Sequence, residues 1–170
     1  ISGVRFERDD LGRTVKMEFL TYVGRKDKTT SKDENYEVIG KRDGIAGLTM
    51  AYDGYNMSEC CFIDSVGKAI MCASGYAVES FEYDGKGNKI KKSYYGTEGN
   101  PVISSDGYAV EVYEYDSRGN EIMESTFGAD GKPTLCTSGF AVLKTEYDER
   151  CNSTKISCYG IEGEPVLCKE

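Results

Sequence analysis

Short stretches of alternating apolar and polar residues recur along the chain, and each is followed by a turn sequence. Segment 108–115, YAVEVYEY, alternates with a period of two and keeps apolar residues on both faces. This pattern predicts a β-strand that is covered at least in part on both sides. Strict alternation places Tyr108 on the face of Val110, and Ala109 on the face of Glu111.

The sequence after this segment predicts that the strand returns as a hairpin. Asp116 suits the first position of a type I turn, and Gly119 suits the left-handed position that follows. A second strand is expected in NEIMESTFG, after which the sequence GADG predicts another turn. Pro133 then ends the strand pairing. Equivalent hairpin turns are predicted near 84–88, 116–120 and 148–152.

This pattern is an internal repeat. Residues 76–107 and 108–139 are identical at fifteen of 32 aligned positions without a gap. The template continues through 140–170 and, with one deletion in the first turn, extends backwards over 45–75. Residues 1–44 begin in register, where FERDDLGR matches YEYDSRGN, and carry an insertion that we place near 26–37. We therefore predict a single repeat array over 1–170 with units 1–44, 45–75, 76–107, 108–139 and 140–170.

The predicted fold is all-β, with tandem β-hairpin repeats forming an elongated solenoid-like or extended meander sheet. One hairpin leaves its apolar face uncovered, so neighbouring units must cover it. Side chains that recur at one template position are expected to stack as ladders between units. The expected ladders are Tyr83, Tyr115 and Tyr147; Tyr95, Phe127 and Tyr159; and Ile103, Leu135 and Leu167. Any helix is expected in the insertion.

The motifs YDGKGN, YDSRGN and YDERCN resemble the signature of bacterial Rhs/YD repeats. The wider template resembles hairpin-repeat arrays of large bacterial proteins, and is more distantly similar to choline-binding and clostridial toxin repeats. Rhs/YD units are usually shorter, and choline-binding repeats carry Trp pairs, whereas this chain has no Trp. The resemblance thus implies an architecture and a place in a larger bacterial protein, and it implies no ligand-binding residue.

The charge of the chain argues against nucleic acid as a partner. The formal net charge is −8, with +1 over residues 1–44 and −9 over 45–170. The acidic part would repel a phosphate backbone. No apolar run is long enough for a membrane-spanning helix, so we expect no membrane insertion.

Two sets of potential metal ligands have simpler structural interpretations. Asp recurs at the first turn of every unit and could form a row of calcium ligands, but β-roll calcium sites need a denser Gly/Asp repeat. We interpret these aspartates as turn caps: Asp9, Asp53, Asp84, Asp116 and Asp148. The chain has no His and no Cys-x-x-Cys pair, so a zinc site is not predicted. No cofactor is expected.

The seven cysteines are interpreted mainly as small buried residues. Cys72, Cys136 and Cys168 share one template position, which Ser104 occupies in the unit between the first two. A disulfide between Cys136 and Cys168 is considered, but the distance between neighbouring units is expected to be too large. Cys60 and Cys61 should point to opposite faces of a strand. The odd number of cysteines leaves a cytoplasmic location open beside a cell-surface or secreted one.

Catalysis is not predicted, because no His can activate a cysteine nucleophile. Glu79 and Glu111 recur in register and are expected to form an exposed charged stripe. Tyr94 and Tyr95 adjoin, so one should point outward, where an aromatic ring could contact a partner. The position of Tyr94 varies between units, which favours a partner-specific protein surface over a repeated sugar pocket. We expect a non-catalytic scaffold or protein-interaction segment of a larger bacterial protein, with a glycan-binding module or part of an Rhs-like toxin shell as alternatives.

Overall fold

The computed structural model describes residues 3–22, 36–38 and 44–168. The described residues form strands and turns without any helix, and hence nothing that could cross a membrane as a helix. The strands are β1 (Gly3–Arg8), β2 (Thr14–Tyr22), β3 (Tyr36–Val38), β4 (Gly47–Asp53), β5 (Asn56–Ile63), β6 (Val78–Tyr83), β7 (Lys89–Tyr95), β8 (Val110–Tyr115), β9 (Glu121–Phe127), β10 (Val142–Tyr147), β11 (Ser153–Tyr159) and β12 (Pro165–Val166).

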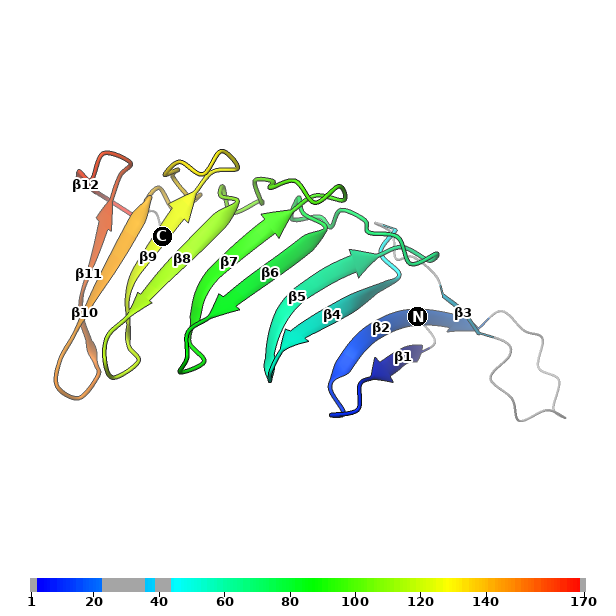
Figure 1. Cartoon of the computed structure of the whole chain (residues 1–170). Coiled ribbons are helices and arrows are strands. Elements are labelled where there is room, and N and C mark those ends of the chain that lie inside the picture. The colour runs from blue at the N-terminus through cyan, green and yellow to red at the C-terminus, as the bar shows by residue number, and fades with distance from the viewer. Residues whose placement is uncertain (1–2, 23–35, 39–43, 169–170) are drawn as a thin grey trace, which may run out of the picture.

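All twelve strands belong to one antiparallel sheet, which confirms the predicted all-β class. Eleven of them follow a single path in chain order from β1 to β12, and β3 pairs with β2 beside this path. Of the two predicted forms, the structure is the extended meander: the sheet stays open, and its ends do not pair with each other within the described residues (Figure 1).

One hairpin lies in each of the five predicted units, whose boundaries remain predictions. The hairpins are β1–β2, β4–β5, β6–β7, β8–β9 and β10–β11. Each has a β-bulge next to its turn, where the returning strand carries one extra residue, such as Ile122 in β9. Bulges of this kind increase the local right-handed twist, in keeping with the bent strands of Figure 1. Of the predicted insertion near 26–37, only the residues that begin β3 are described.

The hairpin turns are confirmed at 84–88, 116–120 and 148–152. In the first of these, the amide of Asp84 donates to the carbonyl of Asn88, and the amide of Gly87 donates back to Asp84. The same pair of hydrogen bonds closes turns at 96–100 and 104–108, so this unit contains three turns of one kind. Gly87 has a φ of 89° at the left-handed position. Figure 1 shows the first turns along one margin of the sheet and the connecting turns along the other.

A small residue joins neighbouring hairpins. Ala77 is completely buried. Its amide donates to the Tyr95 carbonyl of its own unit, at 2.8 Å, while its carbonyl accepts from the Phe62 amide of the preceding unit, at 2.9 Å. Ala46, Ala109 and Ala141 make the same two kinds of bond. The recurrent Tyr-Ala-Val or Phe-Ala-Val sequence thus places a short side chain where two units meet.

The core is a row of aromatic rings along one face of the sheet, and none of its members belongs to a predicted ladder. The predicted ladder of Tyr95, Phe127 and Tyr159 is only partly buried and lies outside this core. Tyr94 is 2% exposed and lies between Tyr76 and Tyr108, with ring centroids 4.4 and 5.9 Å away. Tyr108 also clusters with Cys136 and Phe140. The predicted ladder of Ile103, Leu135 and Leu167 is wrong, because all three are exposed, Leu167 to 94%. Their neighbours Val102 and Val166 pack against the core in their place.

The tyrosines of the YD motifs connect units through hydrogen bonds instead of ring stacking. The hydroxyl of Tyr115 donates to the carbonyl of Lys89 at 2.8 Å. Tyr83 and Tyr52 donate in the same way to Met57 and Thr14. Each acceptor lies at the start of the returning strand in the preceding hairpin, so these bonds link consecutive units.

The predicted face of Tyr108 is also wrong. Strict alternation separates it from Glu111, but its ring packs against Tyr94 and its hydroxyl hydrogen-bonds Glu111. The reason is that β8 begins only at Val110, and the residues before it leave the extended conformation. Tyr108 therefore turns onto the core face.

Candidate functional site

Three of the five turn aspartates cap their turns by the same set of hydrogen bonds, as predicted. Asp84 accepts through Oδ1 from the amides of Lys86 and Asn88, at 2.8 and 2.9 Å, and through Oδ2 from the Asn88 side chain, at 2.8 Å. Asp116 and Asp148 make the same three bonds. The bond from the Asn88 side chain is the main cause that lowers the pKa of Asp84.

Two units vary this turn. In the first, Arg13 stands at the Asn position, and its Nε binds Asp9 at 2.6 Å. In the second, the deletion leaves a two-residue hairpin in which Asp53 pairs directly with Asn56. Gly54 takes a φ of 56° there, so Asp53 stands at a turn of another form than the predicted cap. Across the described part of the chain, no group of three or more Cys, Asp or Glu side chains could hold a metal ion.

Glu79 and Glu111 do not form the predicted exposed stripe. Glu79 makes an ion pair with Lys92 at 3.0 Å on the core face. Glu111 is only 6% exposed. In its unit, the template position of Lys92 is occupied by Glu124, so two carboxyl groups meet where the previous unit has an ion pair.

The Glu111–Glu124 pair is a strongly perturbed acidic site. Burial, followed by the hydrogen bond with Glu111, raises the pKa of Glu124 to about 8. The Tyr113 hydroxyl also donates to Glu111. Retaining glycosidases hold two carboxyl groups about 5–5.5 Å apart and open to substrate. Here the two groups hydrogen-bond each other and Glu111 is buried, so the arrangement favours a structural role.

The structure contains one disulfide that the sequence interpretation missed. Cys158 and Cys168 are bonded, with their Cα atoms 6.2 Å apart. Both belong to the last predicted unit. The turn at 160–164 folds the chain back over β11 and so brings the two cysteines together. The considered Cys136–Cys168 pair does not form, and Cys136 is a buried free thiol. The signal that could have predicted this disulfide is that Cys158 and Cys168 are ten residues apart on either side of a single turn.

The two adjacent cysteines of β5 lie in surroundings that disfavour a nucleophile. Cys60 and Cys61 are free and partly buried. Burial is the main cause that raises the pKa of Cys60 to about 11, which disfavours the reactive thiolate.

The variable aromatic position is a core position, so its interpretation as a partner surface is wrong. Tyr94 is almost completely buried, and Phe62 at the same template position packs edge-on against Tyr76 at 5.8 Å. The residue at this position changes because each inter-unit gap is filled by a different set of neighbours. In the last unit Cys158 stands there, and its disulfide takes the place of an aromatic ring.

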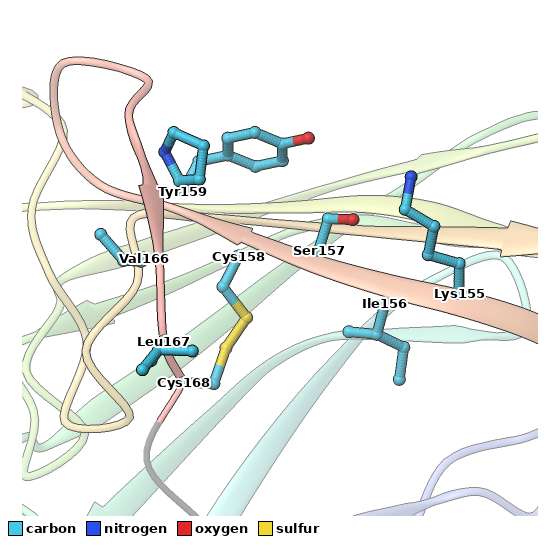
Figure 2. Close-up of a pocket in the computed structure, with 9 residues that line it drawn as sticks. Lys155, Ile156, Ser157, Cys158, Tyr159, Val166, Leu167 and Cys168 are labelled. Carbon is cyan, nitrogen blue, oxygen red and sulfur yellow. A yellow bond between two sulfur atoms is a disulfide. The ribbon is translucent and has the colours of Figure 1, made fainter.

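One edge of β11 has no neighbouring hairpin among the described residues. Within the described residues β11 pairs only with β10 and, at its end, with β12. A groove of about 550 Å³ lies along it, lined by 155–159 and 165–168. Figure 2 shows Ile156 and the Cys158–Cys168 disulfide on one side of β11, and Lys155 and Ser157 on the other. Ile156 is 62% exposed.

This edge corresponds to a surface that is covered elsewhere in the chain. In β9, the matching segment Met123–Ser125 pairs with Val142–Lys144 of the next hairpin. In β7, the segment Lys91–Ser93 pairs with Val110–Val112. The residues Lys155–Ser157 thus stand at the template positions that pair with the next hairpin elsewhere in the array.

No protein-family model matches the chain, and no curated protein is significantly similar to it. The functional argument consequently depends on the sheet and on the way its hairpins pair.

Proposed function

We propose that this chain is a non-catalytic repeat scaffold and protein-interaction segment of a larger bacterial protein. The proposal is carried by one observation: consecutive hairpins are joined by the same three-residue strand pairing. A surface that binds hairpins inside the array suits the binding of a β-strand from a partner.

The chemistry of the described side chains supports this proposal over an enzyme. The turn aspartates are occupied by their own turns, and the one close carboxyl pair is hydrogen-bonded and largely buried. The free cysteines of β5 lie in surroundings that disfavour the thiolate.

A glycan-binding module is the second candidate, and one pocket favours it. A cavity of about 360 Å³ beside the second hairpin is lined by Phe62 and Tyr76, with Ser74 beside them and Phe19 of the first hairpin among the other lining residues. Aromatic rings beside a hydroxyl group suit sugar binding. A closed toxin-enclosing shell is less well supported, because the described sheet is open.

Native-state hydrogen exchange on the full chain tests the scaffold proposal. In a linear array, protection should differ between hairpins and change in steps from the ends to the centre, because each hairpin contacts only its neighbours. A single opening event shared by β4 through β11 would contradict it. A glycan array tests the second candidate, and saccharide binding that is lost in Tyr76→Ala would favour the glycan module instead.

A further inference from the structure

We propose that a cavity beside Glu124, in the fourth hairpin, binds a small primary ammonium cation that carries an aromatic ring. The inference goes beyond the scaffold function, which needs no small ligand. The site lies inside the array, with the third hairpin on one side and the fifth on the other. Three features carry it: the lining of the cavity, the side chains at the same place in the third hairpin, and the proton held by Glu124.

The cavity combines acidic groups with aromatic rings. It has a volume of about 180 Å³ and lies beside the core cluster. Tyr108 and Phe140 of the aromatic row line it and are 7% and 6% exposed. The other lining residues, none of them basic, are Asp106, Glu124, Cys136, Thr137 and Ser138. A carboxylate accepts from an ammonium group and the face of an aromatic ring attracts a cation, so this lining suits an organic ammonium ion.

The third hairpin already holds an ammonium group at this place. Lys92 has the template position of Glu124. The Lys92 ammonium pairs with Glu79 at 3.0 Å and lies 4.9 Å from the centroid of the Tyr94 ring. The same backbone thus accommodates a primary ammonium cation beside a carboxylate and an aromatic ring.

The fourth hairpin keeps the acid of this arrangement and lacks both the cation and the ring. Glu111 stands at the position of Glu79, and Thr126 stands at the position of Tyr94. The Thr126 side chain is completely buried, and its hydroxyl donates to the Thr134 carbonyl at 2.7 Å. Because threonine is shorter than tyrosine, the place of the ring is left to the cavity. A ligand that joins an ammonium group to a ring would supply both missing parts.

A proton occupies the place of the cation when no ligand is bound. Burial, followed by the hydrogen bond with Glu111, raises the pKa of Glu124 to about 8. The ammonium group of the ligand would donate to the Glu124 carboxylate, and the Glu124 proton would leave for the solvent. Binding below about pH 8 should therefore release close to one proton per ligand. The other titratable groups near Glu124 are Asp106, Tyr108, Glu111, Tyr113, Glu121 and Cys136.

Isothermal titration calorimetry of the full chain with benzylammonium chloride tests the proposal. We expect one site per chain and an affinity that increases about tenfold from pH 6 to pH 7, because the ligand competes with a proton on Glu124. Titrations in two buffers with different heats of ionisation measure the released proton. Benzyl alcohol has the same ring without the charge and should show no binding under the same conditions.

Three variants locate the site. Glu124→Lys restores the lysine of the third hairpin, so it should fold and bind no benzylammonium. Glu124→Gln should weaken binding by about tenfold or more and remove its pH dependence. Glu114→Gln, at an exposed glutamate of β8, is the matched control with the same loss of charge and should bind like the parent chain.

A parent chain that binds no benzylammonium at either pH overturns the proposal. Undiminished binding by Glu124→Lys, in a protein that circular dichroism shows to be folded, also overturns it, because the cation would then lie elsewhere on the acidic chain. Binding of benzyl alcohol with the same affinity would mean an apolar cavity without a cation site. The hydrogen-exchange test of the scaffold is independent of all these results.

Discussion

At the scale of single residues, template positions keep their place in the hairpin while their chemistry changes from unit to unit. Gly119 becomes Cys151 in the next unit, and Lys92 becomes Glu124. Since the neighbouring unit shows the alternative residue in the same backbone, each change can be reversed by substitution. Such reversals measure what the residue contributes without redesigning its surroundings.

Cys151→Gly should stabilise the protein. Cys151 has a φ of 62°, as its alignment with the turn glycines predicts. A side chain in the left-handed region costs about 1 kcal/mol, so its removal should raise the free energy of unfolding by about that amount. Urea denaturation of the two proteins checks this. Gly119→Ala is the control: φ is +87° there and a Cβ would meet no atom within 4 Å, so strain alone should destabilise it. A less stable Cys151→Gly protein would contradict the assignment of strain.

Glu124 should make stability depend on pH. Its pKa rises from 4.5 to about 8 on folding, so the folded state binds more protons within this window. The free energy of unfolding should therefore fall as pH increases from about 5 to 9, by on the order of 1–2 kcal/mol after allowance for solvent screening. The titratable groups that interact with it are Glu111, Glu121 and Tyr113.

Two variants test this dependence by urea denaturation across the same pH range. Glu124→Gln should flatten the slope. Glu124→Lys should also remove it and add stability, because a lysine would pair with Glu111 as Lys92 pairs with Glu79. Glu114→Gln, at an exposed glutamate of β8, should keep the slope of the parent. A slope that survives Glu124→Gln would show that another group titrates.

At the scale of elements, each hairpin depends on its neighbours more than on its own faces. The contacts between hairpins are of two kinds: buried rings in the aromatic row, and tyrosine hydroxyls bonded to the preceding unit. The sequence ladders point to Tyr115 as the main interface residue, with a cost of about 3–5 kcal/mol for Tyr115→Ala. In the structure Tyr94 is the main interface residue, because Tyr94 is almost completely buried whereas Tyr115 is only partly buried.

Tyr94→Ala should consequently cost about 3–5 kcal/mol of unfolding free energy, the range for large aromatic residues in cores. Tyr115→Phe keeps the ring but loses the hydrogen bond to the Lys89 carbonyl, so it should cost about 0.5–1.5 kcal/mol. Denaturant unfolding of both variants gives the comparison. Equal losses of unfolding free energy in the two variants would contradict the larger contribution of the aromatic row.

At the scale of the whole molecule, the open meander predicts modular stability. Removing residues 140–170 takes away one hairpin and one interface, and leaves the contacts among the other hairpins intact. The fragment 1–139 should therefore still unfold cooperatively, at a lower temperature than the full chain, and should associate more readily through the β9 edge. Thermal unfolding by circular dichroism checks this. A fragment with no cooperative transition would show that the sheet is one indivisible unit.

Features that depend on a few adjacent residues could be predicted from the sequence alone. The turns at 84–88, 116–120 and 148–152 were predictable because Asp, Gly and Asn satisfy the turn backbone locally. The left-handed conformation of Cys151 followed from the same register. The all-β class and the hairpin order are also local, since alternation and turn spacing specify which strands pair first.

The tertiary structure alone decided which side chains form the core and the site. Ile103 and Val102 are equally apolar, and only the path of the chain across the neighbouring hairpin places Val102 against the core. Tyr108 joins the face of Glu111 because the backbone turns before β8, which alternation does not encode. Likewise, the Glu111–Glu124 pair and the Cys158–Cys168 disulfide arise from neighbours brought together by folding, because their partners are set by the register between strands and not by the residues beside them in the chain.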